Sequence, residues 1–380
     1  MAVMRAEEEL AGGVDEVLPG ILEHPHARAV LGPALPPAGR PSHAYLFHGP
    51  AGAGKRAIAR SFAAALLADG AASPQMVRER VQRGSHPDLT WVTPSGAAEM
   101  LVSDIEEPVV AAAARTPFES ARRVFVIESV EAMNDQAANR LLKTLEEPPS
   151  FAHLVLLSDR REDVLATIAS RCQQVRFDAL PAERIAQRLG GVEKVRAEAC
   201  ARLALGDAVL AARLASAEGD LLRGAAEAFV RAALVGETQG RPWMALLEAA
   251  RAAGVAAGEQ AQERLELELE LVASKERRRY ERESLEGKRR MERRARTQTL
   301  DLALGLAELW LRDVLCVVEG APEVVHALDR RAELEGDAGA VDDGRLAAAI
   351  ELVSASRLSL SLNVAEELAL ESLAYRVQGL

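Results

Sequence analysis

The sequence has 380 residues, and because a single domain usually holds roughly 150 residues, this length favours two or three domains. Hydrophobic residues make up 49% and charged residues 27%, which excludes a disordered or collagen-like chain. Aromatic residues reach only 3%, so the cores must be built from Ala, Leu and Val, and this composition favours helix. A net charge of −11 excludes a protein-wide basic field for holding nucleic acid, although a local basic patch is allowed.

The Cys and His pattern does not indicate a metal site or a disulfide framework. Cys172, Cys200 and Cys316 are scattered, odd in number and contain no CxxC pair, so we expect no zinc module. Among the His residues only His24 and His26 lie close together in the sequence, and they flank a proline. We therefore expect no metal site.

The sequence contains no apolar run of the roughly 18 residues that a membrane span requires. Residues Met1–Leu10 carry Glu7, Glu8 and Glu9 where a signal peptide would have positive charge and then an apolar stretch. We therefore expect a soluble, cytoplasmic protein without a membrane partner.

In the first 180 residues, short apolar runs alternate with helix-like segments. The runs that we predict as strands are 45–48, 89–92, 124–127, 153–158 and 175–177. Helices are predicted between them, including 58–67 and 134–146, the second of which stops before Pro148 and Pro149. Continuous apolar strands alternating with helices are typical of a parallel sheet covered on both faces, so the sequence predicts an α/β domain.

The strand signal ends before Pro181, and everything beyond it reads as helix. Residues 182–217 predict three or four short helices, broken by glycines, and longer helices follow. Within them, Glu259–Leu271 is acidic, whereas Lys275–Arg296 holds eleven Lys and Arg against five Glu. We expect a turn or kink at Gly287, because glycine is the only helix breaker inside that basic run.

The glycine-rich stretch GPAGAGKR, residues 49–56, stands between a predicted strand and a predicted helix, which is the context of a phosphate-binding loop (P-loop). In such a loop the glycines, here Gly49, Gly52 and Gly54, let backbone N–H groups surround an anion, and the lysine, here Lys55, reaches the outer phosphates.

Two positions depart from a working nucleotide site. Arg56 stands where the motif has a Ser or Thr that ligates Mg²⁺, and a guanidinium cannot ligate a cation. The strand 124–127 is followed by Glu128 and Ser129, and the hydroxyl of Ser129 cannot polarise an attacking water as a carboxylate does. The loop is therefore degenerate, and we expect no ATP hydrolysis by this chain. Whether the loop holds ATP or ADP at all stays open.

Two further motifs carry a family resemblance. NRLLKTLEEPP occupies residues 139–149, and SRC follows as Ser170, Arg171 and Cys172. Together with HPDL at 86–89 and VFVIES at 124–129, these motifs resemble the clamp-loader branch of the AAA+ proteins. The resemblance is dense from His43 to Phe177 and weaker over 302–314 and 363–374.

The resemblance implies a RecA-like AAA+ α/β domain over residues 1–179, a small helical lid over 180–222 and a helical collar for oligomerisation over 223–380. It implies a place in the DNA polymerase III holoenzyme, in DNA replication. The implied partners are motor subunits of the gamma/tau type and a delta subunit, with the sliding clamp and primer–template DNA reached through the complex.

The same resemblance assigns Arg171 to the ATP site of a neighbouring subunit, as an arginine finger acting in trans. The alternative is a structural arginine that pairs with a carboxylate of its own domain. The chain also departs from the family pattern, because residues 68–85 contain no Cys for the zinc module and residues 206–209 contain no Arg that would sense nucleotide.

From these motifs we expect a non-hydrolysing stator subunit of the clamp loader that requires no cofactor. One alternative is an active AAA+ ATPase, the motor subunit of the same loader, which Arg56 and Ser129 disfavour. A small-molecule P-loop kinase is a second alternative, and it explains neither LLKTLEEPP nor the helical second half. For Lys275–Arg296, contact with DNA and a solvated hairpin facing the acidic arm both stay open.

Overall fold

A computed structural model describes residues 13–94, 99–269, 277–361 and 364–380. The chain forms two compact units, Met1–Leu180 and Pro181–Leu380. The segment Met1–Leu10, and the residues Lys275 and Asn363 that bound two of the predicted stretches, lie outside the described residues. Within the described parts, no helix has both the length and the apolar character needed to cross a membrane.

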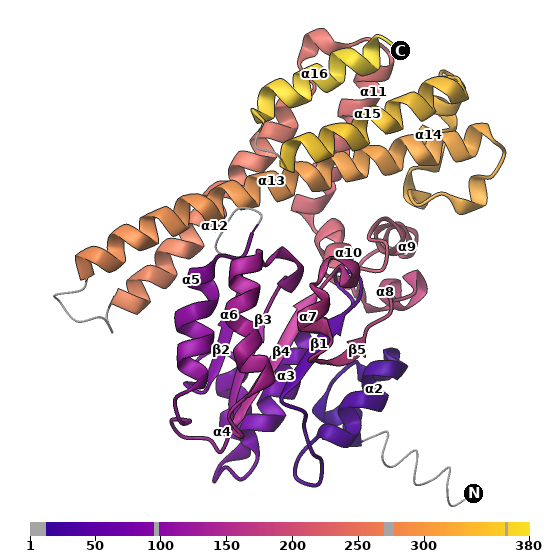
Figure 1. Cartoon of the computed structure of the whole chain (residues 1–380). Helices are drawn as coiled ribbons and strands as arrows, with labels where there is room; N and C mark the ends of the chain where they lie inside the picture. Colours follow the sequence, from indigo (N-terminus) through magenta and orange to yellow (C-terminus); the bar gives the residue numbers. More distant parts are fainter. Residues whose placement is uncertain (1–12, 95–98, 270–276, 362–363) are drawn as a thin grey trace, which may run out of the picture. The chain divides into compact units, whose positions relative to one another are not determined.

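The first unit contains the predicted five-stranded sheet, and all of its strand pairs are parallel (Figure 1). The strands are β1 (Ala44–His48), β2 (Leu89–Val92), β3 (Arg123–Ile127), β4 (Ala152–Ser158) and β5 (Gln173–Arg176). Each predicted strand is therefore confirmed to within two residues at either end. The strand order is β2-β3-β4-β1-β5, so β1 lies between β4 and β5.

Helices cover both faces of this sheet, as its continuous apolar strands predict. They are α2 (Pro25–Leu31), α3 (Lys55–Ala68), α4 (Pro74–Gln82), α5 (Val102–Ile105) with a π-helical turn (Glu106–Ala111), α6 (Asp135–Glu146) and α7 (Ala166–Ala169). Side chains of β1 alternate between the two faces. Tyr45 packs against Phe62 of α3, with ring centroids 5.2 Å apart, whereas Leu46 belongs to the cluster that contains Leu141 of α6.

The second unit contains only helices among its described residues, so the predicted end of the strands before Pro181 is confirmed there. They are α8 (Ala182–Arg188), α9 (Lys194–Leu203), α10 (Ala208–Ala215), α11 (Ala217–Leu234), α12 (Met244–Leu269), α13 (Arg277–Val318), α14 (Arg331–Ala338), α15 (Asp343–Ser361) and α16 (Glu366–Gln378). Their core is one cluster around the buried side chains of Trp243 and Trp310.

The structure contradicts one prediction about this unit and leaves another untested. The expected turn at Gly287 is wrong, because α13 runs through this position, whereas a kink of the helix there stays a prediction. A helix-interior glycine costs only about 1 kcal/mol, and the neighbouring Glu, Lys and Arg residues are good helix formers. The division into lid and collar stays a prediction: position 222/223 falls inside α11, and α9 and α10 share the hydrophobic cluster of the later helices.

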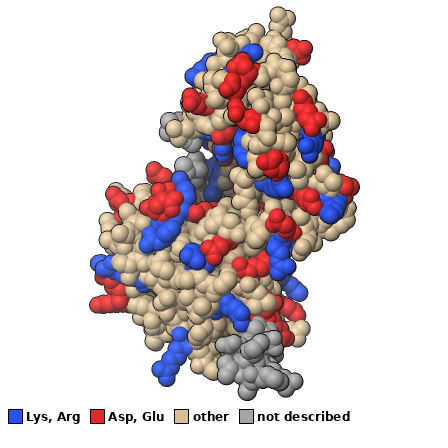
Figure 2. Space-filling model, turned by 90° about the vertical axis from the view of Figure 1, so that its right-hand side faces the viewer, with Lys and Arg blue, Asp and Glu red and all other residues tan. Residues whose placement is uncertain are grey.

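Charged side chains are interspersed on the face of the molecule in Figure 2, where Lys and Arg alternate with Asp and Glu. No field of a single sign dominates that face. This surface agrees with the composition, in which acidic residues exceed basic ones only moderately.

Candidate functional site

The P-loop follows β1 directly, at the carboxyl edge of the sheet, and α3 begins at Lys55. Gly49, Gly52 and Gly54 have positive φ angles of 145°, 67° and 82°. A side chain at Gly49 would collide with the carbonyl oxygen of Phe177. The three glycines are therefore required by the path of the backbone, which a residue with a Cβ atom could not follow without strain.

The lysine of the loop is buried and fully engaged by the protein itself. Lys55 Nζ lies 2.5 Å from the carbonyl oxygen of Gly49, 2.6 Å from that of Pro50 and 2.7 Å from Oδ1 of Asp159. An ammonium group has three N–H donors, so these three acceptors satisfy it. A lysine that binds phosphate must direct its donors at the ligand. Here the donors are occupied by two carbonyl oxygens of the loop and by Asp159, the residue after β4.

The two degenerate positions contact each other. Arg56 forms an ion pair with Glu128, which is nearly buried and also accepts a hydrogen bond from Trp91 Nε1 at 2.7 Å. The guanidinium thus neutralises the carboxylate at the position where an active relative needs a metal. Ser129 follows in the left-handed region, at φ 51°. These residues do not fit a magnesium ion, because Glu128 after β3 is paired with Arg56 and Asp159 after β4 is paired with Lys55.

The mouth of the P-loop carries several basic groups. Burial lowers the pKa of His48, and the positive charges of Arg161, His26, Arg176 and Lys55 lower it further. His26 Nδ1 accepts a hydrogen bond from the backbone N–H of Arg176 at 3.0 Å.

His24 is buried, with its ring centroid 4.9 Å from that of Phe177. No group of His, Cys, Asp or Glu that could hold a metal occurs among the described residues.

Arg171 belongs to a different edge of the sheet. It follows α7 and precedes β5, and its side chain is 35% exposed. The guanidinium donates to Oε1 of Glu146 at 2.5 Å and to the carbonyl oxygen of Thr167 at 2.8 Å. The structure therefore joins SRC to the glutamate of LLKTLEEPP, a contact that the sequence does not reveal.

The strand register separates Arg171 from the P-loop of its own chain. Tyr45 of β1 pairs with Gln173, and His48 pairs with Arg176. Arg171 precedes β5, whereas the P-loop follows β1, and the two strands are parallel. The two features thus lie beyond opposite ends of the same pair of strands, and a five-residue strand spans about 16 Å. Arg171 cannot serve the P-loop from which it is separated in this way.

The neighbouring residues of SRC are structural. Ser170 Oγ donates to the carbonyl oxygen of Thr167 at 3.2 Å. Cys172 is buried, and this burial raises the pKa of its thiol to about 12. A thiol with that pKa is protonated at neutral pH and is therefore a poor nucleophile.

The HPDL motif holds the loop at residues 118–120 in place. Asp88 accepts hydrogen bonds from the backbone N–H groups of Phe118, Glu119 and Ser120, at 2.5, 2.9 and 2.9 Å. Burial alone would raise the pKa of Asp88, but these three donors outweigh it and lower the pKa below its usual value. His86 Nδ1 accepts from the backbone N–H of Asp88. The motif therefore has a local structural role at the start of β2.

Sequence reasoning missed Asp159 and Glu146, which hold the two basic residues of greatest interest. Asp159 directly follows the buried strand β4, a position typical of site residues in parallel sheets. Its proximity to Lys55 depends on β4 lying beside β1, and strand order is not visible in the sequence. Glu146 closes α6, so only the tertiary structure brings it to Arg171.

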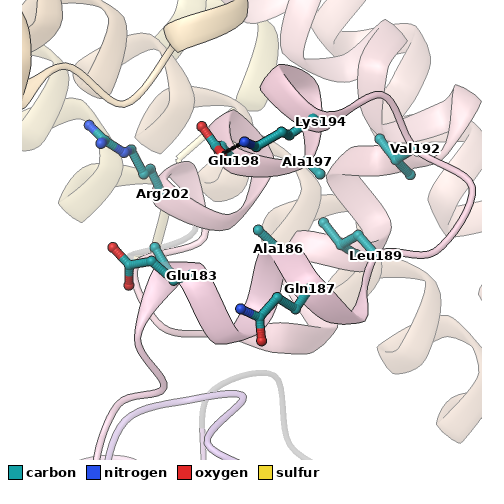
Figure 3. Close-up of a pocket in the computed structure, with 10 residues that line it drawn as sticks. Glu183, Ala186, Gln187, Leu189, Val192, Lys194, Ala197, Glu198 and Arg202 are labelled. Atoms are coloured by element: carbon teal, nitrogen blue, oxygen red, sulfur yellow. Dashed lines mark ion pairs between the residues drawn. The ribbon is translucent and has the colours of Figure 1, made fainter.

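A separate cavity of about 520 Å³ lies between α8 and α9 in the second unit (Figure 3). Its lining mixes apolar side chains, such as Leu189 and Val192, with charged ones, and Lys194 and Glu198 form an ion pair at its edge. Its charged lining residues are Glu183, Lys194, Glu198 and Arg202, none of which belongs to the P-loop or to SRC.

Comparisons with known proteins point to one family. Residues 35–181 match the family described as DNA polymerase III, delta subunit. The delta' subunit of Pseudomonas aeruginosa DNA polymerase III is 41% identical over 138 residues, which are 35% of this chain and 42% of that protein. The Bacillus subtilis delta' subunit is 36% identical over 156 residues, 40% of this chain and 46% of that protein.

The tau subunit of Bacillus subtilis DNA polymerase III is 31% identical over 159 residues, 40% of this chain and 27% of that protein. In all three relatives the matched segment covers less than half of the relative's own length. The sheet, its strand order and the P-loop after β1 give the matched segment the AAA+ fold that the motifs imply. Over residues 35–181 this chain is therefore similar to the AAA+ clamp-loader subunits of bacterial DNA polymerase III, with its highest identities here to the delta' subunits.

Proposed function

We propose that this chain is a clamp-loader subunit of DNA polymerase III that does not hydrolyse ATP itself and that supplies Arg171 to the ATP site of a neighbouring motor subunit. The observation that carries the proposal is the separation of the two basic centres. Lys55 and Arg56 are occupied by acids of their own chain, whereas Arg171 is partly exposed beyond the opposite end of the β1–β5 pair.

The state of the P-loop supports the first half of the proposal. Hydrolysis needs a metal ligand and a carboxylate that orients water. Arg56 removes the ligand, Ser129 replaces the carboxylate, and Asp159 holds the lysine that would contact the phosphates. An occupied and metal-incompatible loop gives the subunit a fixed conformation, as a stator requires.

The state of Arg171 supports the second half. An exposed ion pair is worth only about 0–1 kcal/mol, so Arg171 can leave Glu146, or share its donors, at little cost when a neighbour presents a phosphate. A guanidinium suits this role because it is planar, always charged and able to donate two parallel hydrogen bonds. Such a finger is worth about 10³–10⁵ in rate in other phosphoryl-transfer systems.

The partners follow from the proposal and from the family. The neighbour that receives Arg171 is a motor subunit of the gamma/tau type, and a delta subunit completes the ring. The helices from α11 onwards form the collar through which the subunits associate. The sliding clamp and primer–template DNA are reached through the assembled loader.

The decisive experiment compares ATP turnover of a reconstituted loader containing the wild-type chain, Arg171→Ala or Arg171→Lys. We expect Arg171→Ala to lower the DNA- and clamp-stimulated turnover by the share of one active site, and Arg171→Lys to restore little of it. Arg83→Ala is the matched control, because Arg83 is an exposed arginine of the same unit with a single long ion pair, 3.8 Å to Glu79. Assembly is checked for each variant by size exclusion.

Three outcomes would contradict the proposal. Unchanged turnover with Arg171→Ala would remove the finger role. Loss of folding in that variant would make Arg171 a structural residue instead. Phosphate release by the isolated wild-type chain that disappears in Lys55→Ala would favour the alternative of an active ATPase.

A further inference from the structure

The long helices α12 and α13 lie side by side (Figure 1). An arginine-lined groove of about 540 Å³ lies between them. Arg251 of α12 contributes to it, and Arg289, Arg293 and Arg296 contribute from α13. The remaining lining residues are Gly254, Val255, Glu292 and Glu366. Four guanidinium groups thus surround one groove in a chain whose net charge is −11.

Glycine allows the two helices to approach closely beneath these arginines. A Cβ atom at Gly254 would lie 2.8 Å from Cγ of Arg296 and 3.2 Å from the carbonyl oxygen of Glu292. A side chain there would therefore push α13 away from α12. The close contact places arginines from both helices around one groove.

Four arginines and two glutamates line the groove, so its lining carries an excess of two positive charges. Arg296 pairs with Glu366. Arg251, Arg289 and Arg293 are exposed and make no ion pair or side-chain hydrogen bond with the described residues. On α12, Glu259 and Glu263 are also exposed and unpaired within the described part of the chain, so they do not neutralise these arginines.

The composition of the groove favours phosphate over an acidic peptide. None of its lining residues is aromatic, and its only sizeable apolar side chain is Val255, so it offers little to a peptide side chain or a stacked base. Arg289 and Arg293 are one helical turn apart, about 6 Å along the axis. Arg289, Arg293 and Arg296 together span about 10 Å of the α13 axis, which suits a polymer with regularly repeated negative charges.

We propose that this groove binds the sugar–phosphate backbone of nucleic acid without reading its sequence. The contact goes beyond the proposed stator function, because it gives the chain a direct nucleic-acid surface on its second unit and involves neither the P-loop nor Arg171. Of the two sequence-based readings of Lys275–Arg296, this proposal selects contact with nucleic acid rather than a self-neutralised hairpin.

The test measures binding of the isolated full-length chain to a fluorescent 30-base-pair DNA duplex by anisotropy, over a series of salt concentrations. The groove variant is Arg289→Gln with Arg293→Gln. The matched control is Arg184→Gln with Arg376→Gln, which removes two exposed arginines of the same unit that form no ion pair with the described residues and lie on other helices. Thermal melting checks that both variants remain folded.

We expect the groove variant to bind at least tenfold more weakly and to lose about two units from the slope of log affinity against log salt concentration, because each phosphate contact contributes about 0.9. The control should bind like the wild-type chain. Equal loss in groove variant and control, or wild-type affinity in the groove variant, would overturn the proposal. A polyglutamate peptide that displaces the duplex at equal charge concentration would overturn the assignment to nucleic acid. No loader is present, so these outcomes are independent of Arg171.

Discussion

Arg56 and Glu128 form an ion pair between the start of α3 and the end of β3. The arginine side chain is 72% exposed and the carboxylate only 8%, so Glu128 depends on Arg56 and on Trp91 for compensation of its charge. In the sequence, Arg56 indicates a lost metal ligand, and Ser129, the residue after Glu128, indicates a lost catalytic carboxylate. The contact between Arg56 and Glu128 is visible only in the structure.

The first prediction concerns this pair. Arg56→Ala should lower the free energy of unfolding by about 1–2 kcal/mol, because it leaves a nearly buried carboxylate without its counter-charge. Adding Glu128→Gln should recover part of the loss, since the unpaired charge is then removed. Urea denaturation of the single and double variants measures both effects. Strict additivity of the two substitutions would show that the residues do not interact.

The second prediction separates a structural lysine from a nucleotide-binding one. Lys55→Ala should cost about 1–3 kcal/mol, because Asp159 and the carbonyl oxygens of Gly49 and Pro50 lose their donor. Lys143→Ala, at an exposed lysine of the same unit, should change stability by no more than about 0.5 kcal/mol. Denaturation curves recorded without nucleotide give the change in the free energy of unfolding for each of the two variants. Equal stability of the two variants would contradict the occupied loop.

The third prediction concerns the partner of the finger. Glu146→Gln should lower the turnover of the reconstituted loader by clearly less than the share of one active site, because an exposed ion pair contributes at most about 1 kcal/mol. Arg171→Ala should lower turnover at the adjacent site at least tenfold. The experiment compares the loss of loader turnover caused by Glu146→Gln with the loss caused by Arg171→Ala. If both substitutions impaired turnover equally, Arg171 would act only through its contact with Glu146.

The fourth prediction is a pH dependence that comes from His153. Burial is the main cause that lowers its pKa to about 4, while a hydrogen bond to the Ser42 carbonyl opposes the shift. An unfolded histidine titrates near pH 6.5. Between these values the unfolded chain takes up a proton that the folded chain does not, so the free energy of unfolding falls as the pH drops. Over the whole of this pH range, the shifted pKa of His153 lowers the free energy of unfolding by about 3 kcal/mol.

His153→Asn tests this assignment, because its amide can keep the hydrogen bond to Ser42 but cannot be protonated. Unfolding of the wild-type chain and of the variant is compared at pH 7 and pH 5. We expect the variant to be less stable at pH 7 and to lose less stability on acidification. An identical pH dependence in both proteins would assign the acid sensitivity to other groups.

Much of the first unit could be predicted from the sequence. Its buried parallel strands are continuous apolar runs, and the stop at Pro148 and Pro149 and the glycines 49, 52 and 54 mark local backbone requirements. These patterns depend on only a few neighbouring residues, so they can be recognised without knowledge of the fold. Gly287 is the counter-example, because neighbouring helix formers outweigh a single glycine and α13 continues.

The sequence by itself determined the α/β sheet, the helical second half, the P-loop and the chemical unsuitability of Arg56 and Ser129. Only the tertiary structure decided that Asp159 holds Lys55, that Arg56 meets Glu128, that Glu146 holds Arg171, and that Arg251 shares a groove with the arginines of α13. The physical reason is that each of these contacts joins residues far apart in the chain. Their proximity depends on the order of strands and the packing of helices, which local periodicity does not encode.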